Sequence, residues 1–401
     1  MSKRILAIIL VSIMALSLVA CGSSTANKTY KVGSFNAMSG PNGDIGMGVI
    51  RGAQLAIKEL NEAGGLLGSQ IEFITYDDLA DTDMSVNCVE RLIEQDGVHS
   101  IVGSTVSGCD LAVGHLIEAA QIPAVCPGTA TSFLEKDWTY MFRSTLSVKY
   151  NITGIINACK MLGIETVALF NQANEFGENG SKVMTDACAA AGITIVGKET
   201  YEEGDTDFTA QFSNLAALEA DAYYMTCNTI HIGNAVRQAR ANGFSGYILG
   251  DQLYGSSGPK EVAGAAMKDV IFSAPYVLVS DPSEAATENQ RKFFQAYLDE
   301  YGMMPDVEQC MRGYDAMMII AEGVKRAGTF DGEAVRDAIL SIDDYEGLGG
   351  AGNVNGTFDF TMTKDGDGLV QAALYWVDEN GKDHLLENVL DELLKKAEEE
   401  E

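Results

Sequence analysis

The sequence predicts an α/β protein made of two doubly wound parallel-sheet domains. Apolar strand-like runs alternate with helical patterns along nearly the whole chain, which is typical of consecutive βαβ units. The strand runs are continuously apolar, as expected for parallel strands that are buried on both faces. The 401 residues hold more of these units than one sheet comfortably takes, so two sheets are the simplest packing.

In the first part of the chain, strands and helices follow one another closely. Residues 31–35 are predicted to form the first strand, and the helix at 48–63 has apolar residues at helical spacing before a stop at Gly64-Gly65. The further strands are predicted at 71–76, 100–103 and 123–126, and the further helices at 85–94 and 111–120.

The same rhythm continues through the second part of the chain. The predicted helices are 150–162, 177–191, 208–218, 232–241, 287–301 and 308–327, and the predicted strands are 166–170, 194–196, 222–225, 247–249 and 270–273. Ligands of such folds bind beyond the carboxyl ends of the strands. Functional residues are therefore expected in the loops 36–46, 77–83, 104–109, 127–131, 171–176, 227–231 and 250–254.

The first twenty residues are predicted to be a signal peptide and not part of the fold. Lys3 and Arg4 precede an apolar run at 5–15 that is too short for a comfortable membrane span. The sequence Leu18-Val19-Ala20-Cys21 resembles the bacterial lipobox, in which the Cys thiol is lipidated and becomes the new N-terminus. We therefore expect removal of residues 1–20, membrane anchoring through lipidated Cys21, and a tether at 21–29.

Charge and cysteine content argue against several classes of protein. The chain has 27 Lys and Arg against 57 Asp and Glu, a formal net charge of -30, so nucleic-acid binding is not expected. Seven cysteines remain when Cys21 is set aside, and none shows a CxxC or Cys/His metal spacing. We expect most of them to be buried small side chains and not a disulfide framework.

No catalytic or cofactor motif stands out in the sequence. The chain has four histidines and lacks a GxSxG elbow, a Walker loop and an HExxH pair. Gly43, Gly46 and Gly48 do not have the GxGxxG spacing of a dinucleotide site. Asp77 and Asp78 end a strand and are expected to cap the next helix or bond loop amides. We therefore expect no metal, no cofactor and no enzyme activity.

Hydroxyl side chains follow two neighbouring predicted strands. Ser107 lies in the loop after one strand, and Thr129 and Thr131 lie in the loop after the next, with glycines close by. Neutral donors and a helix N-terminus suit a carboxylate ligand. Asp251 follows another strand and would suit an ammonium group. The alternative is that these side chains are ordinary helix caps.

An ordered series of short motifs resembles the leucine/isoleucine/valine-binding proteins of ABC importers, the type I periplasmic-binding family. The resemblance runs from about Tyr30 to Trp376. It is carried by Ala37-Met38-Ser39-Gly40-Pro41, Gly52-Ala53-Gln54-Leu55-Ala56, Asn61-Glu62-Ala63-Gly64-Gly65, Tyr76-Asp77-Asp78, Gln95-Asp96-Gly97-Val98, Gly204-Asp205-Thr206-Asp207-Phe208, Arg237-Gln238-Ala239-Arg240 and Tyr314-Asp315-Ala316.

The resemblance implies two α/β lobes joined by three hinge crossings, with the ligand in the cleft between them. The crossings would fall at 144–149, 274–277 and 357–360. The first lobe would be 30–146 with 277–358, the second 147–276 with 359–390, and an acidic tail would follow at 391–401. The resemblance also implies hinge closure around the ligand and no enzyme activity.

The family's ligand contacts can be placed on this sequence. Its carboxylate-binding Ser falls on Ser107, and the partner loop places Thr129, Ala130 and Thr131 at the matching positions, with the choice between the two threonines open. Its ammonium-binding acid falls on Asp251 or Gln252. The remaining family contacts, some of which are tyrosines in relatives, fall on Phe176, Asn228 or Thr229, and Ile45.

The sequence therefore predicts a lipid-anchored, monomeric, extracytoplasmic binding protein that delivers an amino acid to ABC permease subunits. A branched-chain or other apolar amino acid is favoured by the resemblance. The alternatives are a ligand-sensing receptor subunit for a small amide, urea or an aromatic acid, and an exported enzyme, which the missing nucleophile–base pair argues against.

Overall fold

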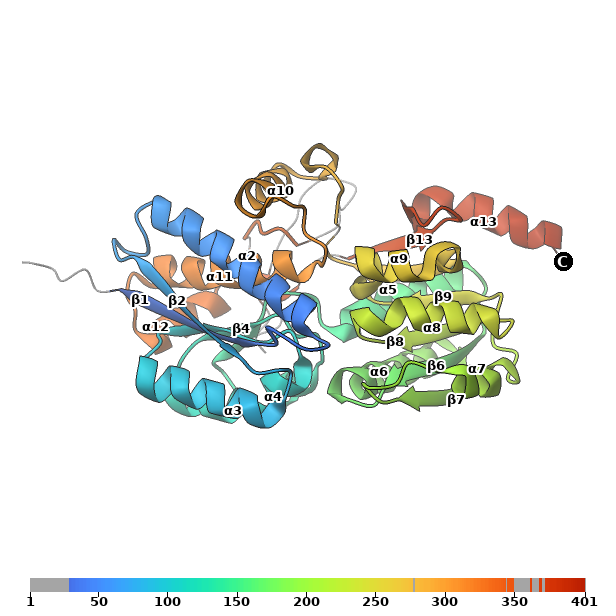
Figure 1. Ribbon diagram of the computed structural model, residues 1–401, viewed down its shortest axis with the longest axis horizontal. Helices are drawn as coiled ribbons and strands as arrows, with labels where there is room; N and C mark the ends of the chain where they lie inside the picture. The colour runs from blue at the N-terminus through green and yellow to red at the C-terminus, as the bar shows by residue number, and fades with distance from the viewer. Residues whose placement is uncertain are drawn as a thin grey trace, which may run out of the picture.

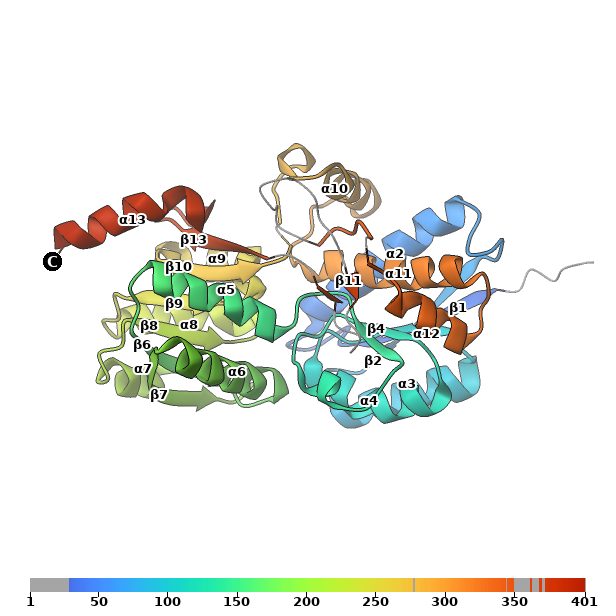
Figure 2. The ribbon, with the colours of Figure 1, turned by 180° about the vertical axis from the view of Figure 1, so that it is seen from behind.

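The computed structural model describes residues 29–276, 278–343, 345–349, 361–362, 368–369 and 372–400. Two α/β lobes lie side by side, each with helices on both faces of its sheet (Figure 1 and Figure 2), so the predicted fold class is confirmed. The predicted signal peptide, Cys21 and the third crossing at 357–360 lie outside the described residues. The domain boundaries given above stay predictions.

The first lobe is built on a parallel five-stranded sheet of order β2-β1-β3-β4-β5. Its strands are β1 (Tyr30–Asn36), β2 (Ile71–Asp77), β3 (Ser100–Val102), β4 (Ala124–Cys126) and β5 (Met141–Arg143). One face packs on α2 (Gly43–Glu62), α11 (Gln309–Ala327) and α12 (Gly332–Leu340). The other packs on α3 (Thr82–Arg91) and α4 (Ser107–Ala120). Helix α10 (Glu288–Tyr301) packs against α2 and α11.

The second lobe has a seven-stranded sheet of order β14-β13-β10-β9-β8-β6-β7. Its parallel strands are β6 (Thr166–Gln172), β7 (Thr194–Tyr201), β8 (Ala222–Thr226), β9 (Tyr247–Gly250) and β10 (Val270–Ala274). Two antiparallel strands, β13 (Ala373–Val377) and β14 (Asp383–Leu385), complete one edge. Helices α7 (Thr209–Ala216), α8 (Thr229–Ala241) and α9 (Ser257–Ala263) cover one face.

The opposite face of this sheet packs on α5 (Val148–Met161), α6 (Glu175–Ala191) and α13 (Leu386–Glu400). Helix α13 begins before the segment predicted as an acidic tail, and Leu393 within that segment is buried in the core of the second lobe. A small hairpin of β11 (Thr361–Met362) and β12 (Gly368–Leu369) stands apart from both sheets.

Helices α2 and α11 cross unusually closely because two glycines lie at their contact. A Cβ on Gly52 would lie 1.8 Å from the carbonyl oxygen of Cys310, and a Cβ on Gly313 would lie 2.1 Å from that of Val49. Neither position has room for a methyl group. The crossing brings the first turn of α11, with Gln309 and Arg312, beside the first turns of α2.

A hydrogen-bonded cluster ties the segments that pass between the lobes. The Tyr276 hydroxyl, just after β10, lies 2.8 Å from the carbonyl oxygen of Ser144, just after β5, and 3.1 Å from Asp315 Oδ2 on α11. The buried Asp315 carboxyl also accepts hydrogen bonds from the backbone N–H groups of Leu348 (2.9 Å) and Gly349 (3.0 Å). Ser144, Tyr276 and Asp315 are all buried.

The α2–α11 crossing generates a stability prediction. Gly313→Ala should lower the free energy of unfolding by about 1–3 kcal/mol, because the helices must separate to admit the methyl group. Urea denaturation with a tryptophan or circular-dichroism signal measures the change. Gly258→Ala, at an exposed position of α9 with no neighbour near the added Cβ, is the matched control and should leave stability unchanged or slightly raised. Equal stability of Gly313→Ala and the parent would show that the crossing can relax.

Candidate functional site

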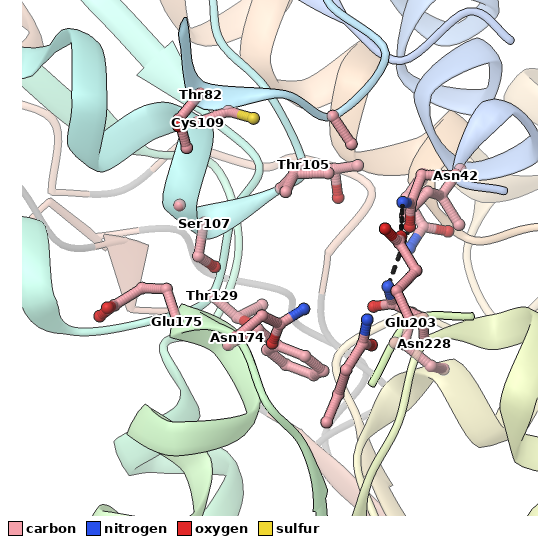
Figure 3. Close-up of a pocket in the computed structure, with 18 of the residues that line it drawn as sticks. Asn42, Thr82, Thr105, Ser107, Cys109, Thr129, Asn174, Glu175, Glu203 and Asn228 are labelled. Carbon is pink, nitrogen blue, oxygen red and sulfur yellow. Dashed lines mark hydrogen bonds between the residues drawn. The ribbon is translucent and has the colours of Figure 1, made fainter. Parts of the chain in front are cut away.

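A cavity of about 360 Å³ lies between the two lobes, at the carboxyl ends of the parallel strands of both sheets (Figure 3). This volume suits a small molecule. Each of the seven loops predicted from the sequence contributes to its wall. The lining residues are Asn42, Ile45, Ala80, Thr82, Thr105, Val106, Ser107, Gly108, Cys109, Thr129, Gln172, Ala173, Asn174, Glu175, Phe176, Glu202, Glu203, Asn228, Gln252, Leu253, Gln309 and Arg312.

One side of the cavity is arranged to receive an anion. Ser107 is the first residue of α4, so its hydroxyl lies beside the free N–H groups and the positive dipole end of a 14-residue helix. Its Oγ accepts a hydrogen bond from the backbone N–H of Ala130 at 3.2 Å, which leaves the hydroxyl hydrogen free for a ligand. The hydroxyl of Thr129 lies on the same wall (Figure 3). A carboxylate fits these neutral donors.

Two buried ionisable side chains, Arg143 and Asp110, support this anion-binding loop from behind. The Arg143 guanidinium donates hydrogen bonds to the carbonyl oxygens of Gly128 and Ala130. Asp110 Oδ1 accepts the backbone N–H of Ser104 at 2.9 Å, while its Oδ2 has no hydrogen-bond partner. Burial raises the pKa of Asp110 from 3.8 to about 8, against the opposing effects of hydrogen bonds from Cys126 and Ser104 and of the Arg143 charge. This carboxyl is therefore largely neutral at pH 7.

Hydrogen bonds between the lobes close two edges of the cavity. Asn42, from the first lobe, donates through Nδ2 to Glu203 Oε1 at 2.6 Å and accepts from Asn228 Nδ2 at 2.9 Å (Figure 3). At the other edge, Asn179 Oδ1 accepts the backbone N–H of Thr131 at 3.2 Å, and Asn179 Nδ2 donates to the Thr131 hydroxyl at 3.1 Å. The described conformation therefore has its lobes in direct contact around the cavity.

The structure places six of the ten predicted ligand-binding residues on the cavity wall. These are Ile45, Ser107, Thr129, Phe176, Asn228 and Gln252. Ala130 is buried behind the wall and contributes its backbone N–H to Ser107. Thr131 contacts Asn179 at the lobe edge, and Thr229 is buried at the start of α8 with an unpaired hydroxyl.

Asp251 and Gln252 differ in their position relative to the cavity. Asp251 is buried behind the wall, where its Oδ1 caps the backbone N–H of Leu253 at 3.0 Å, and burial raises its pKa to about 7. Gln252 lies on the wall, and its Oε1 accepts a hydrogen bond from Asn151. A carbonyl oxygen has two lone pairs, so Gln252 retains one acceptor site for a ligand.

Several wall residues were not singled out from the sequence. Asn42, Gln172 and Asn174 lie inside loops that were predicted to be functional, so their amides could have been found there. Glu202 and Glu203 follow β7, which runs five residues past its predicted end. Gln309 and Arg312 come from the first turn of α11, and nothing in the local sequence places that turn at the cavity.

Arg312 is the only cationic side chain among the described residues that line the cavity, and its charge is already balanced. Its guanidinium forms a buried ion pair with Glu308, both side chains being 2% exposed, and donates to the carbonyl oxygen of Pro127 at 2.9 Å.

In the described part of the chain, no three His, Cys, Asp or Glu side chains group as metal ligands. Among the same residues, no helix has the length and apolarity needed to cross a membrane.

The chain is similar to known binding proteins over most of its length. The family model for periplasmic binding proteins matches residues 29–382. The leucine-, isoleucine-, valine-, threonine- and alanine-binding protein of Pseudomonas aeruginosa is 27% identical over 350 residues, which cover 84% of this chain and 90% of that protein.

Solved structures with the same fold carry different ligands. The branched-chain amino acid transporter substrate binding protein LivJ from Streptococcus pneumoniae, in complex with isoleucine, is 25% identical with a TM-score of 0.77, and the match covers 89% of this chain and 98% of LivJ. A solute binding protein of an ABC transporter from R. palustris, in complex with benzoate, has a TM-score of 0.78 at 18% identity, with 89% and 95% coverage. The latter likeness concerns the fold alone.

The raised pKa of Asp110 generates a pH prediction. The folded chain retains a proton that the unfolded chain releases between about pH 4 and pH 8, so this group makes stability fall as the pH rises through that range. One such proton corresponds to a slope of about 1.4 kcal/mol per pH unit. The Asn side chain of Asp110→Asn stays neutral. The free energy of unfolding of this variant, measured by urea denaturation at a series of pH values, should therefore fall less steeply with pH than that of the wild type, by up to that amount. Asp207→Asn is the control, because the exposed Asp207 has a lowered pKa and titrates below this range. An unchanged slope in Asp110→Asn would contradict the assignment.

Proposed function

The chain belongs to the periplasmic binding protein family, and we propose that it captures an amino acid in the cavity between its lobes and delivers it to the permease of an ABC transporter. The predicted family resemblance is confirmed. Members of this family are extracytoplasmic solute-binding proteins without enzyme activity, so the chain is a binding protein and not an enzyme.

The best support for an amino-acid ligand is that the cavity wall carries donors that can bind a carboxylate and, near them, acceptors that can bind an ammonium group. The ligand carboxylate would bind the hydroxyls of Ser107 and Thr129 at the N-terminus of α4. The ammonium group would bind Gln252 rather than Asp251, because only Gln252 lies on the wall. The P. aeruginosa relative is named as an amino-acid-binding protein and the S. pneumoniae relative as part of an amino acid transporter. Both names support the same class of ligand.

Delivery would depend on the lobes closing over the ligand. The Asn42–Glu203 and Thr131–Asn179 hydrogen bonds join the two lobes and would be made only when the cleft is closed. We propose that the permease subunits bind this closed form of a monomer. Lipidation of Cys21 would keep the protein at the membrane surface that carries the permease.

A thermal-shift panel tests the proposed class of ligand. Protein beginning at Ser23 is melted with each of the twenty amino acids, benzoate, urea and acetamide. A ligand at a hundred times its dissociation constant should stabilise the fold by about 2.7 kcal/mol. At least one amino acid should raise the melting temperature. Shifts with benzoate, urea or acetamide and with no amino acid would replace the amino-acid proposal by the aromatic-acid or amide alternative.

Ser107→Ala tests the carboxylate contact. The change should weaken binding of the best amino acid by about 1–3 kcal/mol, because the ligand carboxylate loses a buried donor. Isothermal titration calorimetry measures the loss. Ser213→Ala is the control, since this exposed serine of α7 bonds only to Thr209 and Asn242, far from the cavity wall. Wild-type affinity in Ser107→Ala would move the carboxylate to another part of the cavity.

A further inference from the structure

The cavity wall is unusually rich in polar side chains for a site that would hold an apolar ligand. Six carboxamides line it: Asn42, Gln172, Asn174, Asn228, Gln252 and Gln309. Three carboxylates line it as well: Glu175, Glu202 and Glu203. Arg312, which Glu308 neutralises, offers no free positive charge. The wall therefore carries a negative charge and an excess of hydrogen-bonding groups.

Gln309 offers a buried acceptor that no protein group satisfies. Its side chain is 1% exposed, it lines the cavity, and its Oε1 has no hydrogen-bond partner. Leaving such an oxygen unpaired is unfavourable. Gln309 begins α11 and packs beside α2, where a Cβ on Gly48 would lie 3.1 Å from the Gln309 Cβ. A hydrogen-bond donor on the ligand would satisfy this oxygen.

Glu203 offers a negative charge at the edge of the same cavity. Its carboxylate is oriented by Asn42, which donates to Oε1 at 2.6 Å and is itself held by Asn228 at 2.9 Å. The side chain is exposed, and a bound ligand that covered it would remove its water. A carboxylate that loses water without gaining a partner is strongly unfavourable.

Glu203 lies away from the carboxylate-binding side of the cavity. Figure 3 shows Ser107 and Thr129 on one side and Asn42, Glu203 and Asn228 on the other. The α-ammonium of an amino acid is attached to the same carbon as the carboxylate, so it stays near Ser107 and Gln252. The group that reaches Glu203 must therefore belong to the far end of the side chain.

We propose that the ligand is an amino acid with a cationic side chain, whose terminal ammonium or guanidinium group binds Glu203 and Gln309. This inference rests on the proposed amino-acid function, and it differs from the apolar side chain that the family resemblance implies. The Glu203 carboxylate and the Gln309 oxygen are both acceptors, and a terminal ammonium or guanidinium group carries several donor hydrogens. Ile45 and Phe176, also on the wall, provide apolar surface for the methylene groups of such a side chain.

Titration calorimetry with matched ligands tests the proposal. Wild-type protein is titrated with lysine, ornithine, arginine, glutamine, norleucine and leucine. A cationic amino acid should bind about tenfold or more tightly than norleucine, which has the same carbon chain as lysine without its terminal nitrogen. Glu203→Gln should weaken binding of the cationic ligand by about tenfold or more and change norleucine binding little.

Two further variants separate the side-chain contact from a general loss of fold. Glu199→Gln lies on β7 close to Glu203 in sequence but away from the cavity wall, and should bind like the wild type. Gln309→Leu should reduce the preference for the cationic ligand over norleucine, because the unpaired acceptor is removed. The melting temperature of each ligand-free variant reports whether the fold is intact.

The outcomes distinguish this inference from the function on which it rests. Tightest binding of leucine, norleucine or glutamine would overturn the cationic side chain and leave amino-acid binding standing. A cationic preference that Glu203→Gln does not reduce would overturn the role of Glu203. Failure of every amino acid to bind would overturn the proposed function and this inference together.

Discussion

The ligand cavity depends on the hydrogen-bonded cluster of Tyr276, Ser144 and Asp315. Each lobe supplies part of the cavity wall, so the wall is complete only when the two lobes hold a defined relative position. Tyr276 and Ser144 lie in two different segments that pass between the lobes, and Asp315 reaches Leu348 and Gly349 near the end of the segment after α12. The Asn42–Glu203 contact at the cavity edge also joins the two lobes.

Charge in the cavity is divided between two ends with different chemistry. At the anion-binding end, Asp110 and Arg143 lie behind the wall, and the Ser107 and Thr129 side chains and the N-terminus of α4 line the cavity, with Glu175 beside them. At the other end, Glu203 faces the cavity directly. The buried Arg312–Glu308 pair contributes little net charge to either end. The different charges at the two ends of the cavity therefore favour one orientation of a bound ligand.

The sequence was sufficient for the fold and for the loops that form the cavity, because both follow from strand–helix alternation. It was less informative about individual contacts. Asp251 and Gln252 are adjacent, and only the start of a 3₁₀ turn decides that Asp251 caps it while Gln252 reaches the wall. Gln309 is brought to the site by the glycine-mediated crossing of α2 and α11, a contact between segments about 260 residues apart. β7 was predicted too short because its end is half exposed and polar.

The seven cysteines of the described chain are all unpaired, and six of them are buried. Burial raises the pKa of the partly exposed Cys88 to about 11 and raises those of the buried thiols as well, so reactive thiolate is scarce at neutral pH. The lobes thus acquire their shape without any oxidative step. Production of the folded chain in a reducing cytosol, or refolding it without a glutathione redox buffer, is compatible with this architecture, and oxidants would find few reactive thiolates to attack.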